Sequence, residues 1–109
     1  MKNIFISIVL LLSTQTFAAS THIANRMITL QNLSSETIVE FHASRVSTDK
    51  WEEDILGHDV LPPGYKVKIN VDDGTGACLF DFKTVSTHHT IIRRNVDVCT
   101  VYTYTIEDE

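Results

Sequence analysis

The chain has 109 residues, and its 14 acidic side chains outnumber nine basic ones, which gives a formal charge of −5 at pH 7. This length suits one small domain. An acidic chain without a basic cluster argues against nucleic-acid binding and against binding to anionic membrane surfaces.

Residues 1–18 have the pattern of a secretory signal peptide. Lys2 gives a positive start, an apolar run follows, and residues 16–18 place small side chains at positions −3 and −1 of a cleavage site. The run is shorter than the roughly 20 apolar residues that span a membrane. We therefore expect export to the periplasm or the medium, with no membrane anchor. The mature chain, residues 19–109, is expected to form a single domain with a formal charge of −6.

Two strands are predicted early in the mature chain. Residues 26–31 have an expected inner face of Ile28 and Leu30, and residues 37–44 alternate in the same way. The second strand has three residues on its expected inner face: Val39, Phe41 and Ala43. Alternation with a period of two is typical of a strand with one buried face.

Residues 45–59 form the longest irregular stretch and contain the only tryptophan, Trp51. The favoured interpretation places Trp51, Ile55 and Leu56 as a plug at one end of the core. Three large apolar side chains would otherwise be exposed to water at a high free-energy cost.

A second interpretation of this stretch is a binding loop. Trp51 would be its anchor, and Asp54 and Asp59 would supply polar contacts, since loops on rigid scaffolds often carry function. Both interpretations stay open at the level of sequence.

A central segment, residues 56–82, is predicted to contain a β-hairpin. Residues 61–64 combine two prolines and a glycine, which remove two donors and then let the chain reverse. Residues 65–71 alternate as a strand, and the acidic, glycine-rich residues 72–76 favour a tight turn. The strand 65–71 is therefore expected to pair with the next one, which has a single apolar face: Cys78, Phe80 and Phe82.

The two cysteines, Cys78 and Cys99, are expected to form a disulfide, because export leads to an oxidising compartment. The bond would close a loop of about 20 residues, worth roughly 3 kcal/mol in the chain-entropy model. Metal-binding or redox thiols are the less favoured alternative, because no Cys-x-x-Cys or Cys–His zinc spacing is present. Nearby, Asp81 or Asp97 is expected to pair with one of the arginines at positions 93 and 94.

Residues 90–96 and 100–107 are predicted as further strands, and a turn with His88 and His89 precedes them. No amphipathic helix is recognisable. The sequence therefore predicts an all-β fold: a small antiparallel β-sandwich, or a small barrel, of about six to seven strands stapled by one disulfide.

No nucleophile elbow, phosphate-binding loop, zinc-protease motif or dinucleotide motif occurs, so we expect no catalytic residues and no cofactor. Calcium binds six to eight oxygens from acidic loops, which makes Asp72 and Asp73 weak candidates for a metal site. Aspartate is also common in turns for backbone reasons, and that explanation is favoured. His88 and His89 are expected to be solvated turn residues.

Four motifs occur in an order that resembles a family of small exported bacterial proteins. They are Trp51-x-x-Asp54-Ile55-Leu56-Gly57, the Leu61-Pro62-Pro63-Gly64 turn, Cys78-Leu79-Phe80-Asp81, and residues 93–99 ending in Cys99. Glu52 stands where the family often has glycine. Some members are labelled as argininosuccinate lyases or twin-arginine signal proteins. This chain is too short for the first, and its N-terminus lacks the arginines of the second.

Two functions from different classes follow as hypotheses. The first is a non-catalytic exported binding or protein-interaction module, such as an inhibitor or accessory of another exported protein in the cell envelope. The alternative is a β-sandwich of the envelope that binds calcium or a small ligand. An enzyme ranks behind both.

Overall fold

The computed structural model describes residues 26–109, and the predicted signal peptide with its cleavage site lies outside them. The described chain contains six strands and no helix: β1 Met27–Asn32, β2 Ile38–Arg45, β3 Lys66–Asn70, β4 Leu79–Ser86, β5 Thr90–Asp97 and β6 Thr103–Ile106. Within this part of the chain, no helix is long and apolar enough to cross a membrane. The predicted all-β class is confirmed.

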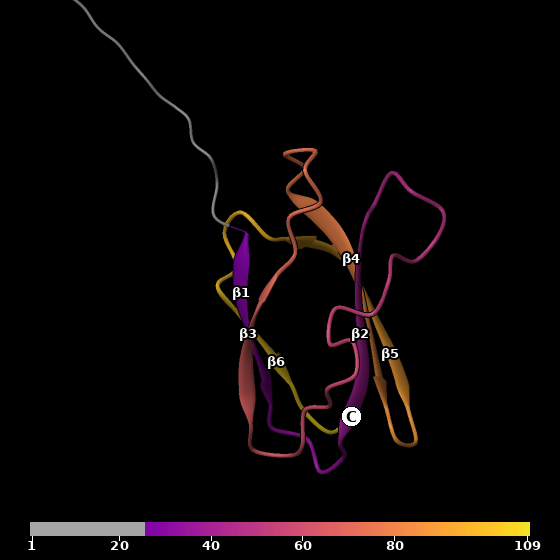
Figure 1. Cartoon of the computed structure of the whole chain (residues 1–109), viewed down its shortest axis with the longest axis vertical. Helices are drawn as coiled ribbons and strands as arrows, with labels where there is room; N and C mark the ends of the chain where they lie inside the picture. The colour runs from indigo at the N-terminus through magenta and orange to yellow at the C-terminus, as the bar shows by residue number, and fades with distance from the viewer. Residues whose placement is uncertain (1–25) are drawn as a thin grey trace, which may run out of the picture.

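The strands form two three-stranded sheets that face each other as a sandwich (Figure 1). One sheet has the order β3-β1-β6 and the other β2-β4-β5. All pairs are antiparallel except β1 and β6, which run in parallel, with Thr29 opposite Thr103. The fully antiparallel arrangement that was expected is therefore wrong in one place. The chain crosses from the second sheet to the first after β5, and such a crossover allows β6 to arrive in the direction of β1.

The predicted hairpin between residues 65–71 and 78–82 does not form. β3 pairs with β1, and β4 pairs with β2 and β5, so residues 71–78 cross between the sheets. Arg26 holds this crossing in place, because its guanidinium donates to the carbonyls of Gly76 at 2.7 Å and Ala77 at 3.1 Å. The turn chemistry of residues 72–76 thus reverses the chain into the opposite layer rather than into a neighbouring strand.

The core lies between the sheets and follows the predicted alternation in most places. Ile28, Leu30, Phe41, Phe80 and Phe82 are all buried, as expected. Two rings make an edge-to-face contact, with 5.0 Å between the centroids of Phe41 and Phe82.

Two positions depart from this pattern. A bulge near the start of β2 turns Ile38 inward, so that Ile38 is buried and Val39 is only half-buried. Val67, on the edge strand β3, stays 37% exposed although it lies in phase with the buried Ile69.

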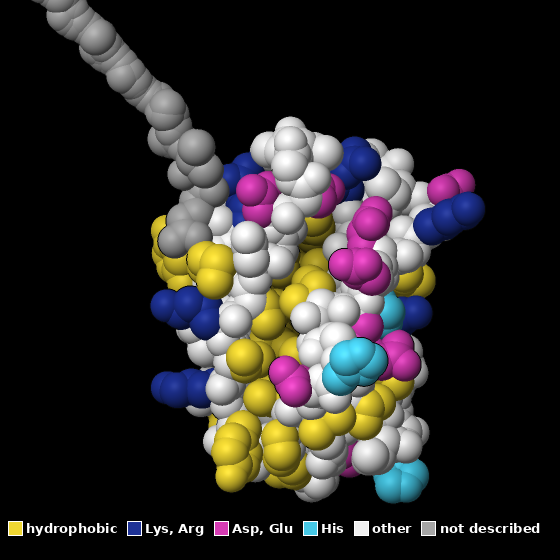
Figure 2. All heavy atoms as spheres, viewed as in Figure 1, with side chains coloured by type: hydrophobic (Ala, Val, Ile, Leu, Met, Phe, Trp, Pro, Cys, Tyr) yellow, Lys and Arg dark blue, Asp and Glu magenta, His cyan; other side chains and the backbone are white. Residues whose placement is uncertain are grey.

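Residues 54–61 cover the outer edge of β2 (Figure 1). The Ile55 amide donates to the Phe41 carbonyl at 2.8 Å, and Ile38 and Leu61 form an isolated antiparallel bridge. Ile55 and Leu56 pack against the core from this side. Figure 2 shows apolar side chains along the face between the two sheets. Covering the edge protects β2 from pairing with another chain.

The predicted disulfide between Cys78 and Cys99 is confirmed, with Cα atoms 5.3 Å apart. It ties the start of β4 to the connection between β5 and β6. A hydrogen bond from the Val98 amide to the Cys78 carbonyl, 2.8 Å long, supports the same junction.

Candidate functional site

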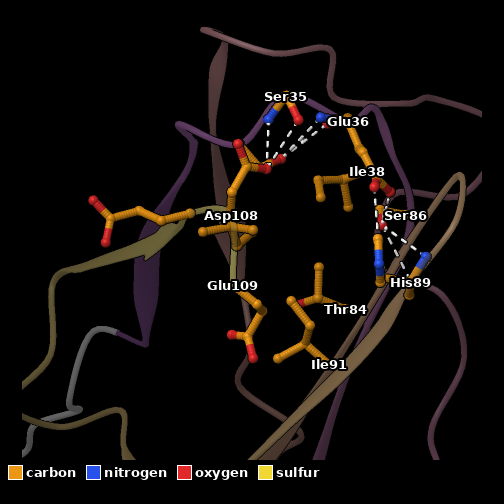
Figure 3. A pocket seen from close by; sticks show the side chains of 12 residues that line it. Ser35, Glu36, Ile38, Thr84, Ser86, His89, Ile91, Asp108 and Glu109 are labelled. Atoms are coloured by element: carbon orange, nitrogen blue, oxygen red, sulfur yellow. Dashed lines mark hydrogen bonds and ion pairs between the residues drawn. The ribbon is translucent and has the colours of Figure 1, made fainter.

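A pocket of about 250 Å³ opens at the end of the sandwich where the β1–β2 turn, the β4–β5 turn and the residues after β6 meet (Figure 3). We call it the end pocket. Its walls are formed by Ile38, Thr84, Ile91 and Ile106. Its mouth is formed by polar residues from three separate segments: Ser34, Ser35, Glu36, Ser86, His89, Glu107, Asp108 and Glu109.

Asn32, the last residue of β1, builds the turn on one side of the pocket. Its side chain is fully buried, and its amide nitrogen donates to the carbonyls of Glu36 at 2.8 Å and Leu61 at 2.9 Å. Its side-chain oxygen accepts from the amide and the hydroxyl of Ser34. One buried side chain therefore fixes the backbone on which Ser34, Ser35 and Glu36 stand.

Glu36 is held by donors from β4 and the β4–β5 turn. The Ser86 hydroxyl donates to its Oε1 at 2.6 Å, the His88 amide to the same oxygen at 3.0 Å, and the His89 ring lies 2.7 Å from Oε2. The Ser86 hydroxyl has the largest effect on the pKa of Glu36, and desolvation, the next largest, opposes it. With the added contacts of His88 and His89, the pKa of Glu36 falls to about 2. Glu36 is therefore a fixed negative charge at the mouth.

Residues 107–109 cross the mouth on its other side. Asp108 Oδ1 accepts from the Ser35 amide at 2.9 Å and the Ser35 hydroxyl at 3.0 Å, and Glu109 Oε2 pairs with Arg93 at 3.1 Å. Within residues 26–109, the side chain of Glu107 and the second oxygens of Asp108 and Glu109 have no donor. The mouth therefore carries carboxylate oxygens without a hydrogen-bond donor, and a cationic group would complement them.

Thr84 lies between the two acidic sides of the pocket (Figure 3). It is only 2% exposed, and among the described residues its hydroxyl is the one buried side-chain polar atom without a hydrogen-bond partner. A buried hydroxyl left unpaired costs about 1–3 kcal/mol, so nearly all such groups in folded proteins have a partner. Thr84 is also one of the residues that line the end pocket.

Trp51 does not plug the core, and that part of the favoured interpretation is wrong. The Lys83 ammonium lies 5.2 Å and the Arg94 guanidinium 5.7 Å from the indole ring. Lys83 projects from the outer face of the sheet β2-β4-β5, because alternate residues of β4 point to opposite faces and Phe82 and Thr84 point inward. Arg94, on the neighbouring strand β5, contacts the same indole. The contact with two cations stabilises the half-buried indole outside the core.

The other two residues of the predicted binding loop lie in different settings. Asp54 Oδ1 accepts from the amides of Phe41 at 2.8 Å and Leu56 at 3.0 Å, so this carboxylate fastens the loop to β2. Asp59 is exposed. Neither lines the end pocket, and Trp51 instead borders a smaller polar depression with Asp81 and Arg94.

The weak calcium candidates, Asp72 and Asp73, use their oxygens within the turn. Asp72 Oδ1 accepts from the Gly74 amide at 3.0 Å, and Asp73 Oδ2 pairs with Arg45 at 2.8 Å. Partial burial opposes ionisation of Asp73, but hydrogen bonds from Thr75 and the Arg45 charge outweigh it and lower its pKa. Both aspartates act as turn residues, in line with the favoured explanation.

Across residues 26–109, the one group of potential metal ligands close enough to share an ion is Cys78, Asp97 and Cys99. The two sulfur atoms are bonded to each other, which leaves no thiolate for a metal. Asp97 accepts from the Cys99 amide at 2.9 Å. The expected carboxylate–arginine pair is Asp81 with Arg94, at 2.9 Å.

Sequence reasoning missed the end pocket. None of Glu36, Thr84 and Asp108 was predicted as a site residue. Only one local signal could have marked them: Thr84 is a hydroxyl residue at a position where the alternation of β4 demands an apolar one, in phase with Phe80 and Phe82.

A comparison of the chain with protein-family models, with curated proteins and with solved structures finds no match.

Proposed function

We propose that this chain is a non-catalytic exported binding or protein-interaction module of the periplasm or the extracellular medium, and that its binding site is the end pocket. The observation that carries the proposal is that Thr84, a residue lining that pocket, has a buried hydroxyl without a hydrogen-bond partner. Binding pockets typically combine apolar walls with a few convergent polar groups, and the end pocket has this composition.

The exported location is supported by three independent features. Residues 1–18 have the pattern of a signal peptide, the Cys78–Cys99 disulfide suits an oxidising compartment, and the four motifs resemble those of small exported bacterial proteins.

A binding role is favoured over catalysis by the state of the mouth residues. A general base works best when its pKa lies near the working pH, and the pKa of Glu36 lies far below it, at about 2. His89, the other residue that could transfer a proton there, is hydrogen-bonded to Glu36. The pair is therefore suited to holding a fixed charge and a fixed shape.

The alternative function, a ligand-binding β-sandwich of the envelope, uses the same pocket if the ligand is a small molecule. Calcium binding at Asp72 and Asp73 has no support from their geometry, because their carboxylates accept donors from their own turn and from Arg45.

A matched pair of substitutions on β5 tests the proposal. Ile91 lines the end pocket, whereas its neighbour Ile92 is 40% exposed and does not line it. Ile91→Trp should fill the pocket, and Ile92→Trp adds the same bulk elsewhere on the same strand. Each variant is expressed with its own leader, treated with an amine-independent photo-cross-linker in the envelope fraction, and checked for folding by its melting curve.

Wild type and Ile92→Trp are expected to give the same discrete cross-linked product or the same bound ligand by native mass spectrometry, and Ile91→Trp is expected to lose it. Equal products from all three proteins would show that the end pocket is not the binding site.

A further inference from the structure

We infer that the end pocket binds an ammonium group on an alkyl stem, supplied by a lysine side chain of a protein partner. This inference rests on the proposed function, because it takes the end pocket as the binding site and specifies what enters it.

The charge of the mouth selects a cation. Four carboxylates surround it, from Glu36 and from residues 107–109, and the opposing groups are Arg93 and His89. The pKa of Glu36 keeps one of these charges in place throughout the physiological range. An anionic group would meet like charge on both sides of the pocket (Figure 3).

The free acceptors match the donors of an ammonium group. A lysine ammonium carries three donors and no acceptor. Within residues 26–109, Glu107, Asp108 and Glu109 all keep carboxylate oxygens without a donor at the mouth of the pocket. The hydroxyl of Thr84, which also lines the pocket, has no partner either. The Thr84 oxygen is the buried one, so a donor that reaches it removes a cost that the free protein carries.

The walls match the stem. Ile38, Ile91 and Ile106 give the pocket apolar sides below an acidic mouth. Lysine buries its methylene groups along apolar surface while its charged end seeks polar partners, and this division suits such a pocket.

Other ligand classes fit less well. A purely apolar group would leave the Thr84 hydroxyl unpaired. A divalent metal would need several carboxylates to converge, but Glu36 and Asp108 are held apart by separate donors, from Ser86 and Ser35. Their oxygens do not form a cluster of metal-ligand spacing in the described chain.

The test is a titration of the full mature protein, monitored through its backbone amide chemical shifts. The probe is Nα-acetyl-lysine N-methylamide. Its comparators are the norleucine compound, which has the stem without the charge, the Nε-acetyl-lysine compound, and the glutamate compound. The lysine probe is expected to shift the amides of Ser35, Thr84, Ile91 and Asp108 saturably, and this effect should weaken with added salt.

Two variants locate the interaction. Thr84→Val should weaken binding of the lysine probe at least tenfold, since it removes a hydrogen bond to a charged group. The double variant Glu107→Gln, Asp108→Asn should weaken it by at least as much. Its control is Glu52→Gln, Glu53→Gln, which removes the same charge from an exposed loop away from the pocket and should leave binding unchanged.

The outcomes separate this inference from the proposed function. If the norleucine or glutamate compound shifts the pocket amides and the lysine probe does not, the ligand class is wrong while the end pocket remains a binding site. If no compound shifts them and Ile91→Trp also leaves cross-linking unchanged, the proposed function fails as well. Butylamine, an alkyl ammonium without a peptide backbone, serves as a further probe. If it shifts the same amides as strongly as the lysine probe and no protein cross-link depends on Ile91, the ligand is a free amine rather than a partner's lysine.

Discussion

Under the proposed function, Thr84 serves binding at the expense of stability. Its position on β4 is in phase with Phe80 and Phe82, and valine would satisfy the core equally well in shape. The hydroxyl is buried without a partner in the free protein, and this lowers stability. Destabilising residues are common at functional sites, because activity often depends on them.

We therefore expect Thr84→Val to raise the free energy of unfolding by about 1 kcal/mol or more, because it removes a buried unpaired hydroxyl. Urea denaturation measures the change. Thr103→Val, on the exposed face of β6, serves as the control for the higher strand propensity of valine. A loss of stability relative to this control would mean that the Thr84 hydroxyl has a partner in the free protein.

Glu36 makes the stability of the folded protein depend on pH. Its pKa is lowered from 4.5 to about 2 in the folded protein, first by the Ser86 hydroxyl. A lowered pKa contributes stability that is complete above the unfolded value and is lost as the pH falls toward the folded value. The stability advantage of wild type over Glu36→Gln should therefore be full near neutral pH and should shrink between about pH 4.5 and 2.

Thermal melts of wild type and Glu36→Gln across that pH range measure this advantage. Glu53→Gln, on an exposed residue of the loop, is the control for a change in overall charge. An advantage that stays constant down to pH 2 would contradict the role assigned to the Ser86 and His89 contacts.

Residue-level prediction worked where the cause is local. The turn roles of Asp72 and Asp73 follow from chemistry within a few residues, as does the pairing of Asp81 with Arg94 across neighbouring strands. Trp51 was misplaced because its environment comes from Lys83 and Arg94, which are distant in the chain. The cost of exposing apolar side chains explains why Ile55 and Leu56 pack against the core. An aromatic ring has a further possibility, because cations can stabilise it outside a core.

At the scale of elements, alternation located the strands but not their partners. All six strands lie where the period-two pattern predicts them, to within a few residues. The hairpin prediction failed because an Asp-Gly turn permits reversal without fixing the layer into which the chain returns. The guanidinium of Arg26, far away in sequence, holds residues 76 and 77 in the crossing between sheets.

The disulfide belongs to this scale because it joins the start of β4 to the connection that leads into β6. Reduction should lower stability by roughly 3 kcal/mol in the chain-entropy model. For a domain of this size, that loss corresponds to a fall in Tm of more than about ten degrees. Scanning calorimetry with and without reductant gives the value.

The double variant Cys78→Ser, Cys99→Ser should melt near the reduced wild type and should not respond to reductant. If reduction leaves the wild-type Tm unchanged, the disulfide does not staple the fold.

At the scale of the whole molecule, the end pocket could not be predicted because no stretch of sequence contains it. Its lining comes from residues 34–38, 84–91 and 106–109, which belong to both sheets. They meet only once β6 lies parallel to β1 and β5 lies beside β4. Asn32 fixes the β1–β2 turn, which supplies residues 34–36. The acidic composition argued only against nucleic acid and anionic membranes as partners, whereas the topology decides where the charges converge.

The most direct measurement of the central claim is an isotope-filtered nuclear Overhauser experiment on the labelled protein with unlabelled Nα-acetyl-lysine N-methylamide. We expect contacts from the ε-methylene of the probe to the methyl groups of Thr84, Ile91 and Ile106, and their loss in Ile91→Trp. Contacts confined to another surface, such as the Trp51 indole, or no contacts at saturating probe, would contradict it.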